Sequence, residues 1–246
     1  MTAGRRTPNL QSFKAPKAAG RYIALQRTHL QSSAANSARR LFGPRLFNRY
    51  LVGLFTSPAK IATAYGRELA AEYGSMAPFL PESATSILDI GCGVAGIDVF
   101  LFRHYAAQAP QLLLMDKSMT DVSIRYGYRP HASFYNDLDV ALAVLAANDI
   151  PKARVKLLEA KPGQIIGQAR NIDLIVSLLS WGFHYPLDTY LDEALAALSP
   201  QGVIIIDLRK GTPGSTELAA KTNLSVTVIA DEPKHQRVRI SQRPPN

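Results

Sequence analysis

From Ser86 onward, short runs of apolar residues alternate with longer segments in which apolar residues recur at helical spacing. The apolar runs predict five strands, at 86–91, 111–116, 154–160, 172–179 and 202–208. Helical spacing predicts helices over 137–149 and 187–198. Strands that are apolar on both faces and separated by helices are typical of a parallel sheet covered on both sides. We therefore predict an α/β fold with a doubly wound sheet.

The end of the chain has a different pattern from the middle. Residues 224–230 and 236–242 alternate between apolar and polar residues around the polar segment "DEPKH". Alternation with period two on both sides of a polar turn predicts an antiparallel hairpin.

The beginning of the chain is predicted to be helical only in part. Helical spacing runs through residues 36–80, and the pair Ser57-Pro58 has the form of a helix start. Residues 1–35 show no sustained period. We therefore expect a flexible arm over 1–35, a helical extension over 36–80 and the core domain over 81–246.

The composition of the 246 residues excludes several classes of protein. A single cysteine, Cys92, excludes a disulfide framework and a multi-cysteine zinc site, and we predict no metal site. No uncharged apolar run approaches the roughly 18 residues of a membrane-spanning helix. The start of the chain has no apolar core of a signal peptide, so we expect a cytoplasmic protein.

The net charge of +9 is concentrated at the N-terminus. Residues 1–67 contain 12 lysines and arginines and no acidic residue, whereas the other 179 residues contain 16 basic and 19 acidic residues. This basic segment has three interpretations: a solvated arm, a segment attracted to nucleic acid through counterion release, or a targeting peptide. The sequence leaves all three open.

The strongest chemical motif follows the first predicted strand, in "ILDIGCGVAG". Gly91, Gly93 and Gly96 form G-x-G-x-x-G, a loop in which the backbone can turn tightly and approach a ligand. Asp116 follows at the end of the second strand, where a carboxylate can accept hydrogen bonds from a ribose diol. This much fits either NAD or S-adenosylmethionine. Asp89 favours the second, because an anion beside the loop suits a sulfonium and an ammonium group but repels a pyrophosphate.

The motifs in order resemble those of class I S-adenosylmethionine-dependent methyltransferases. The resemblance rests on "ILDIGCGVAG", Asp116, "IDLIVSLL" and "LSPQGVIIIDL", together with the closing hairpin, and covers residues 60–242. It implies a Rossmann-like sheet of seven strands in the order 3-2-1-4-5-7-6, with the last strand antiparallel, and a methyltransferase activity. It also implies a cofactor site for S-adenosylmethionine, made by Asp89, Gly91, Cys92, Gly93, Gly96, Asp116, Lys117, Glu159 near the adenine, and Ser177.

The methyl acceptor is expected above the fourth strand, where the chain reads "SLLSWGFHYPLDTYL". The Pro-Pro-aromatic motif of nucleobase amine methyltransferases is missing there. Chemistry at cytosine C5 needs a cysteine nucleophile at the acceptor, but the only cysteine, Cys92, lies in the glycine loop. Arsenic methylation needs several cysteines and is excluded for the same reason. An oxygen acceptor is therefore the favoured interpretation.

Five residues are candidates for the acceptor side. His184 is a candidate general base, since the ordinary pKa of histidine is about 6.5; the alternative is a capping or positioning role. Trp181, Phe183 and Tyr185 are candidate walls for a sugar or ring; the alternative for Trp181 is packing under the N-terminal helices. Tyr135, in the aromatic segment 125–138, is a further candidate.

Two functions follow, and a third is weaker. The first is O-methylation of a sugar or another small polar metabolite. The second is RNA methylation, with residues 1–67 holding the nucleic acid. The third is a non-catalytic binding protein, which the intact glycine loop and Asp116 disfavour.

Overall fold

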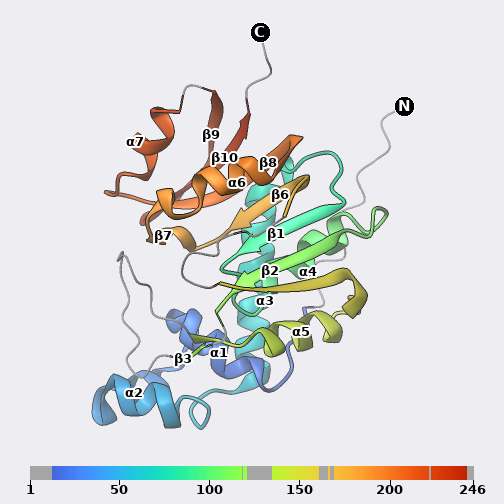
Figure 1. The fold of residues 1–246 in the computed structure, drawn as a ribbon. Coiled ribbons are helices and arrows are strands. Elements are labelled where there is room, and N and C mark those ends of the chain that lie inside the picture. The colour runs from blue at the N-terminus through green and yellow to red at the C-terminus, as the bar shows by residue number, and fades with distance from the viewer. Residues whose placement is uncertain are drawn as a thin grey trace.

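Figure 1 shows the computed structural model of the chain. The structure describes residues 13–117, 119–120, 135–160, 166, 169–221 and 223–242. Most of the aromatic segment 125–138 lies outside these residues, as do residues 1–12 at the start of the basic segment.

The fold is built on a seven-stranded sheet with the order β5-β2-β1-β6-β8-β10-β9. The strands are β1 (Ser86–Ile90), β2 (Gln111–Asp116), β5 (Val155–Glu159), β6 (Ile172–Ser177), β8 (Leu198–Arg209), β9 (Leu224–Asp231) and β10 (His235–Gln242). The first five are parallel, and β10 runs antiparallel to both β8 and β9. Numbered along the chain, these core strands have the order 3-2-1-4-5-7-6. The predicted topology and the closing hairpin are confirmed.

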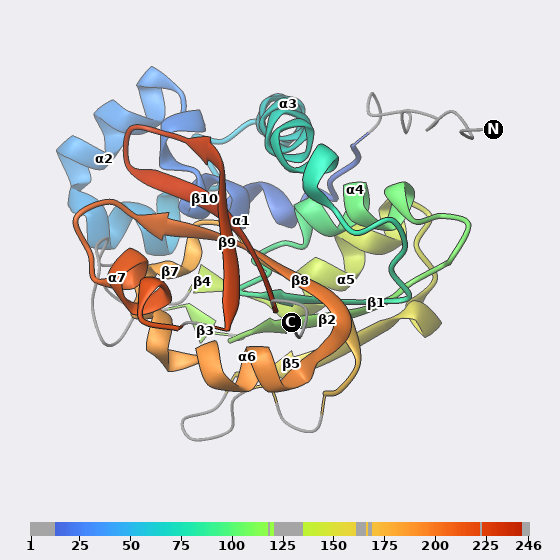
Figure 2. The same ribbon diagram turned by 90° about the horizontal axis from the view of Figure 1, so that it is seen from above.

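Helices cover both faces of the sheet (Figure 2). One face carries α1 (Ala19–Gln26), α3 (Pro58–Met76), α4 (Gly96–His104) and α5 (Leu138–Ala147), and the other carries α6 (Leu191–Ala197) and α7 (Gly214–Ala219). Neighbouring residues of a strand point to opposite faces. In β6, Leu174 and Val176 therefore belong to the first core, while Ile175 between them belongs to the second.

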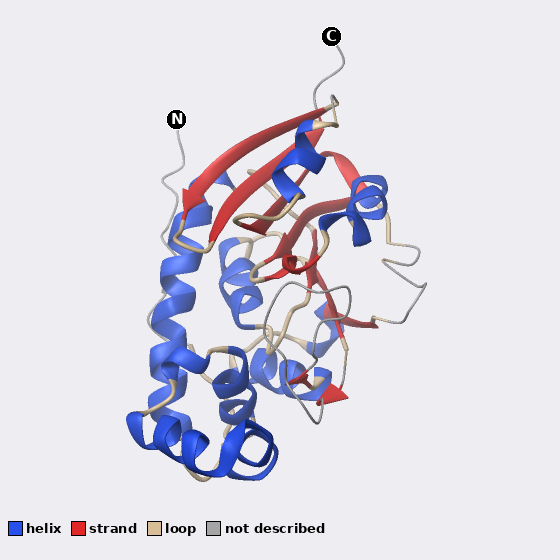
Figure 3. Ribbon diagram, turned by 90° about the vertical axis from the view of Figure 1, so that its left-hand side faces the viewer, coloured by secondary structure: helices blue, strands red, loops and turns tan. Residues whose placement is uncertain are grey.

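The N-terminal helices are joined by short 3-10 and irregular turns. η1 (Thr28–Leu30) follows α1, and η3 (Ala77–Phe79) follows α3. The helix α2 (Ser33–Leu46) bends at Gly43, whose φ is 78°, and continues into η2 (Phe47–Leu51). The predicted helix start at Ser57-Pro58 is confirmed as the beginning of α3, the long helix at one side of the molecule in Figure 3.

The described part of the predicted arm differs from the expectation of a loose segment. Residues 19–26 form α1, in which Ile23 and Leu25 are fully buried and pack in the core with α3. The helix has only 8 residues and two large apolar side chains, too few to produce a visible period. Its stability comes from packing against the rest of the core rather than from its own sequence.

The chain after β6 also differs from the prediction. The predicted strand 172–179 ends at Ser177, because Leu179 has a positive φ of 54°. A further strand, β7 (Ser180–Tyr185), then begins and packs against β8. A two-stranded ribbon of β3 (Met119–Thr120) and β4 (Tyr135–Asn136), and the 3-10 helices η4 (Lys152–Arg154) and η5 (Leu187–Thr189), complete the elements.

Within the described residues, none of the helices is long and apolar enough to cross a membrane.

Candidate functional site

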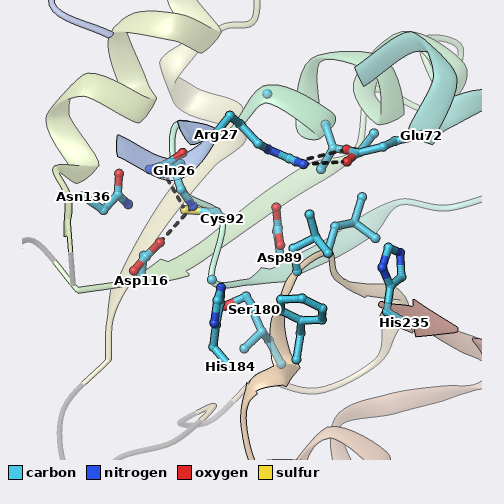
Figure 4. Close-up of a pocket in the computed structure, with 18 of the residues that line it drawn as sticks. Gln26, Arg27, Glu72, Asp89, Cys92, Asp116, Asn136, Ser180, His184 and His235 are labelled. Carbon is cyan, nitrogen blue, oxygen red and sulfur yellow. Dashed lines mark hydrogen bonds and ion pairs between the residues drawn. The ribbon is translucent and has the colours of Figure 1, made fainter. Parts of the chain in front are cut away.

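A cavity of about 890 Å³ opens at the carboxyl ends of the central parallel strands. Its walls come from the glycine loop after β1, the ends of β2 and β6, the strand β7, the helices α1 and α3, and the β9–β10 turn (Figure 4). Ligands of doubly wound sheets bind at this edge. The volume lies in the range of small-molecule sites, which measure about 300–1,000 Å³.

The glycine loop is built so that it has no room for side chains. Gly91 and Gly93 have φ values of 78° and 55°, a conformation that L residues with a Cβ rarely adopt. A Cβ on Gly91 would lie 1.8 Å from the hydroxyl oxygen of Ser180, and a Cβ on Gly93 would lie 2.8 Å from Oε1 of Gln26. Gln26 ends α1, so the N-terminal helix reaches the loop that the sequence predicts to hold the cofactor.

Gly96, the third glycine of the motif, allows two helices to pack closely. A Cβ at this position would lie 2.6 Å from the hydroxyl oxygen of Tyr65 and 2.7 Å from Cδ1 of Leu69, both on α3. The first turn of α4 therefore lies directly against α3. Cys92, between the first two glycines, is 7% exposed, and burial raises the pKa of its thiol, so it fills the loop as a neutral side chain.

Asp116 connects the end of β2 to the glycine loop. Its Oδ2 accepts a hydrogen bond from the amide of Gly93 at 2.8 Å, and its Oδ1 accepts one from the amide of Lys117 at 2.7 Å. Burial raises the pKa of Asp116 to about 6, and the hydrogen bonds from these two amides act in the opposite direction. A carboxylate has about four lone-pair sites, so the side chain keeps sites for a ribose diol.

Asp89 brings a second carboxyl group to the cavity. It is 3% exposed and lies at the end of β1, on the face that α3 and α4 cover. The carboxyl group of Asp98, fully buried in α4, lies close enough for its charge to act on Asp89, and neither of its oxygens has a hydrogen-bond partner among the described residues. Burial, followed by the charge of Asp98, raises the pKa of Asp89 well above its usual range, and burial raises that of Asp98 to about 7. Two acids in one buried place favour a shared proton or a bound cation.

The opposite wall of the cavity is aromatic and comes mainly from β7. The hydroxyl groups of Ser180 and Tyr185 lie 3.3 Å apart beside the glycine loop. The rings of Phe183 and His184 pack edge to face with centroids 4.9 Å apart, and both residues line the cavity. The structure therefore brings His184 and Tyr185, two of the residues predicted from the sequence, to the same cavity as Asp89 and Asp116. Figure 4 shows His184 with the two carboxyl groups.

Three predicted site residues lie elsewhere. Trp181 is fully buried in the core beneath β7, where its Nε1 donates to the carbonyl of Leu187 at 2.7 Å, so it is not a wall of the acceptor site. Ser177 is also fully buried and donates to the carbonyl of Ile90 at 2.7 Å, which joins β6 to β1. Glu159 ends β5 outside the cavity, whereas the next residue, Ala160, lines it.

For Tyr135, the structure describes the backbone in β4 and not the side chain, so its predicted role stays a prediction. The next residue, Asn136, is 5% exposed and lines the cavity.

Several site residues were missed at the sequence level. Gln26 and Arg209 reach the cavity from elements distant in the chain, and no local pattern marks them. Ser180 follows the unexpected turn at Leu179. The sequence does mark Asp98 as unusual. It is the one acid within the apolar run "GIDVFLF", and acids are rarely found at core positions of a helix.

No protein-family model matches this sequence, and neither does any curated protein. Among solved structures, the chain is similar to precorrin-6y C5,15-methyltransferase from Geobacter metallireducens GS-15, with a TM-score of 0.50 and 13% identity over 73% of this chain and 89% of that chain. It is also similar to ribosomal protein L11 methylase from Lactobacillus delbrueckii subsp. bulgaricus (TM-score 0.49, 14% identity, 72% and 78% covered). A third similar structure is the SAH-bound methyltransferase PaMTH1 of Podospora anserina (TM-score 0.44, 13% identity, 74% and 79% covered).

At these identities, the likeness to solved structures concerns the fold. The strand order, together with the similarity to the first of these structures, shows that the chain has a Rossmann-like methyltransferase fold.

Proposed function

We propose that this chain is an S-adenosylmethionine-dependent methyltransferase that methylates an oxygen atom of a small polar acceptor, such as a sugar. The observation that carries the proposal is the pair of buried carboxyl groups, Asp89 and Asp98, behind the glycine loop of a methyltransferase fold. A buried pair of acids is costly unless a proton or a cation compensates it. The ammonium and sulfonium groups of S-adenosylmethionine provide that positive charge.

The residues present fit this cofactor better than a dinucleotide. Gly91 and Gly93 line the cavity without side chains, Asp89 supports a cationic methionine moiety, and Asp116 with its remaining lone pairs supports a ribose. A pyrophosphate beside Asp89 would meet a like charge in a place shielded from water. When bound, S-adenosylmethionine supplies an electrophilic methyl group, and the chain's task is to hold the acceptor in line with it.

The acceptor side of the cavity supports a small polar molecule. Phe183 offers a ring face or edge, and His184 and Tyr185 offer polar atoms within the same wall. Burial raises the pKa of the Tyr185 phenol well above 10, so this hydroxyl stays protonated and can donate a hydrogen bond to an acceptor oxygen. His184 is the candidate base that takes the proton of the acceptor hydroxyl.

Calorimetry with S-adenosylmethionine, S-adenosylhomocysteine and NAD tests the cofactor. We expect the first two to bind and NAD not to bind. Transfer of a labelled methyl group to sugars, nucleosides and RNA then tests the acceptor. Tight binding of NAD with no binding of S-adenosylmethionine or S-adenosylhomocysteine would refute the proposal.

RNA remains a second candidate acceptor, because Arg40, Arg45 and Arg49 are exposed on α2 and η2. Leu41 and Leu54, in the same N-terminal segment, are 78% and 79% exposed. Apolar side chains such as these make no favourable contact with charged phosphate groups. Retention on heparin separates the two candidates. A triple Arg→Gln variant at the three positions is expected to lose RNA methylation if RNA is the acceptor, and to keep sugar methylation unchanged if it is not.

A further inference from the structure

The cavity has charges of opposite sign at its two ends. Asp89 and Asp116, with Asp98 behind them, make one end acidic. The other end, at β8 and the β9–β10 turn, is lined by Arg209, Lys234 and His235 together with one acid, Glu232. This division suits two ligands of opposite charge that lie next to each other.

Arg209 is the basic group of this end that is most closely built into the wall. It is half-buried at the end of β8, and its guanidinium carbon lies 5.1 Å from the centre of the Phe183 ring. No carboxylate of the described residues forms an ion pair with it. An arginine that is held against an aromatic ring and lacks an acidic partner offers its hydrogen-bond donors to a ligand.

The other arginines beside Arg209 are already paired. Arg237 bonds Asp207 through Nε at 2.7 Å and Nη2 at 2.9 Å, and both residues are almost fully buried. Arg27, in the wall formed by the N-terminal helices, pairs with Glu72 at 2.9 Å. The nearby acid Asp207 is paired with Arg237, and its Oδ1 also lies 3.6 Å from Nε2 of His235, so it does not compensate the charge of Arg209.

The other residues around Arg209 come from β10 and the turn before it. His235 lies opposite Arg209 in the β8–β10 pairing, and its ring packs edge to face with Phe183, with centroids 5.8 Å apart. Lys234 precedes it in the turn and is exposed at the mouth of the cavity. Glu232, also exposed, is the acidic group of the turn that faces the same space.

We propose that the methyl acceptor is an anion, and that Arg209 binds its carboxylate or phosphate group. The proposal rests on the proposed function, because it assigns this end of the cavity to the acceptor. It restricts the class of acceptor from any small polar molecule to one that carries an acidic group on the side away from the acceptor oxygen. Lys234 attracts the anion at the mouth, and Phe183 holds the arginine in place.

Anion binding can be tested before the acceptor is known. The protein is saturated with S-adenosylhomocysteine, and its melting temperature is measured in up to about 50 mM inorganic phosphate or acetate, with sodium chloride keeping the ionic strength constant. We expect at least one of the two anions to raise the melting temperature by about 1–2 °C over chloride, as binding to the native state requires. The more effective anion tells a phosphate site from a carboxylate site.

Three variants make the result specific. Arg209→Gln is expected to lose the shift, Arg209→Lys to keep part of it, and Arg154→Gln, a change at an exposed arginine of η4, to keep all of it. If neither anion raises the melting temperature, or if Arg209→Gln keeps the shift, the inference is overturned. Failure of S-adenosylhomocysteine to bind at the outset would instead refute the proposed function, so the two failures are distinguishable.

Discussion

The carboxyl groups of Asp98 in α4 and Asp89 at the end of β1 are both buried, at no more than 3% exposed, and lie close enough for the charge of Asp98 to raise the pKa of Asp89. The two groups share a buried place in which a negative charge is costly. The protonation of this pair therefore links the stability of the fold to the binding of a cationic ligand.

The first prediction is a loss of stability as the pH rises. Asp98 has a pKa of about 7 in the folded protein against an ordinary value of 3.8, so the folded state holds a proton between these values that the unfolded chain has released. The free energy of unfolding of the ligand-free protein should fall between about pH 4 and pH 7, by at least about 1 kcal/mol. Urea denaturation across this range measures it. Asp98→Asn, which cannot ionise, should make the slope shallower, while the raised pKa values of Asp89 and Asp116 maintain the remainder. An unchanged slope would show that Asp98 is not one of its causes.

The second prediction concerns protons released on cofactor binding. A cationic ligand beside Asp89 favours the ionised form of the pair, so S-adenosylmethionine, with its sulfonium and ammonium groups, should displace a proton near pH 6.5. Calorimetric titrations in buffers of different ionisation enthalpy count the protons. Asp98→Asn should reduce the release, and binding without any proton exchange in the unaltered protein would contradict this account of the pair.

The third prediction is that Gly93→Val abolishes binding of S-adenosylmethionine. The φ of 55° at this position is strained for valine, and its Cβ would lie 2.8 Å from Oε1 of Gln26. Calorimetry measures the loss. The matched control is Gly74→Val, in α3, where a Cβ has no atom within 4 Å; binding that survives Gly93→Val would show that the cofactor does not approach this loop.

The fourth prediction concerns His184. If the acceptor atom is a hydroxyl oxygen, His184→Ala should lower turnover by about 10² to 10⁴-fold without changing the affinity for S-adenosylmethionine. The measurement is transfer of labelled methyl groups to the acceptor found in the screen. Loss of cofactor affinity would mark His184 as a structural residue, and full turnover would remove it from the mechanism.

The fifth prediction follows from the burial of α1. Ile23→Ala should lower the free energy of unfolding by about 2–5 kcal/mol, because Ile23 is fully buried in the core with α3. Leu54→Ala, at a residue 79% exposed, is the matched control and should change it by less than about 0.5 kcal/mol. Urea denaturation compares the two, and equal effects would contradict the packing of α1.

The sequence by itself determined the seven strands of the main sheet, the hairpin among them, and the position of the glycine loop. These features depend on neighbouring residues: apolar runs form buried strands, alternation with period two forms a half-exposed hairpin, and glycines permit positive φ. Asp89 and Asp116 were found for the same reason, since the end of a parallel strand fixes where its last side chain lies.

Tertiary structure decided which of the other residues reach the cavity. Trp181 has the aromatic character of a binding wall, but the turn at Leu179 and the strand β7 place it in the core. Gln26 and Arg209 come from the two ends of the chain and meet the cavity only because α1 packs on α3 and β8 pairs with β10. A local pattern gives the face of an element that is buried, and it carries no information about which distant element covers that face.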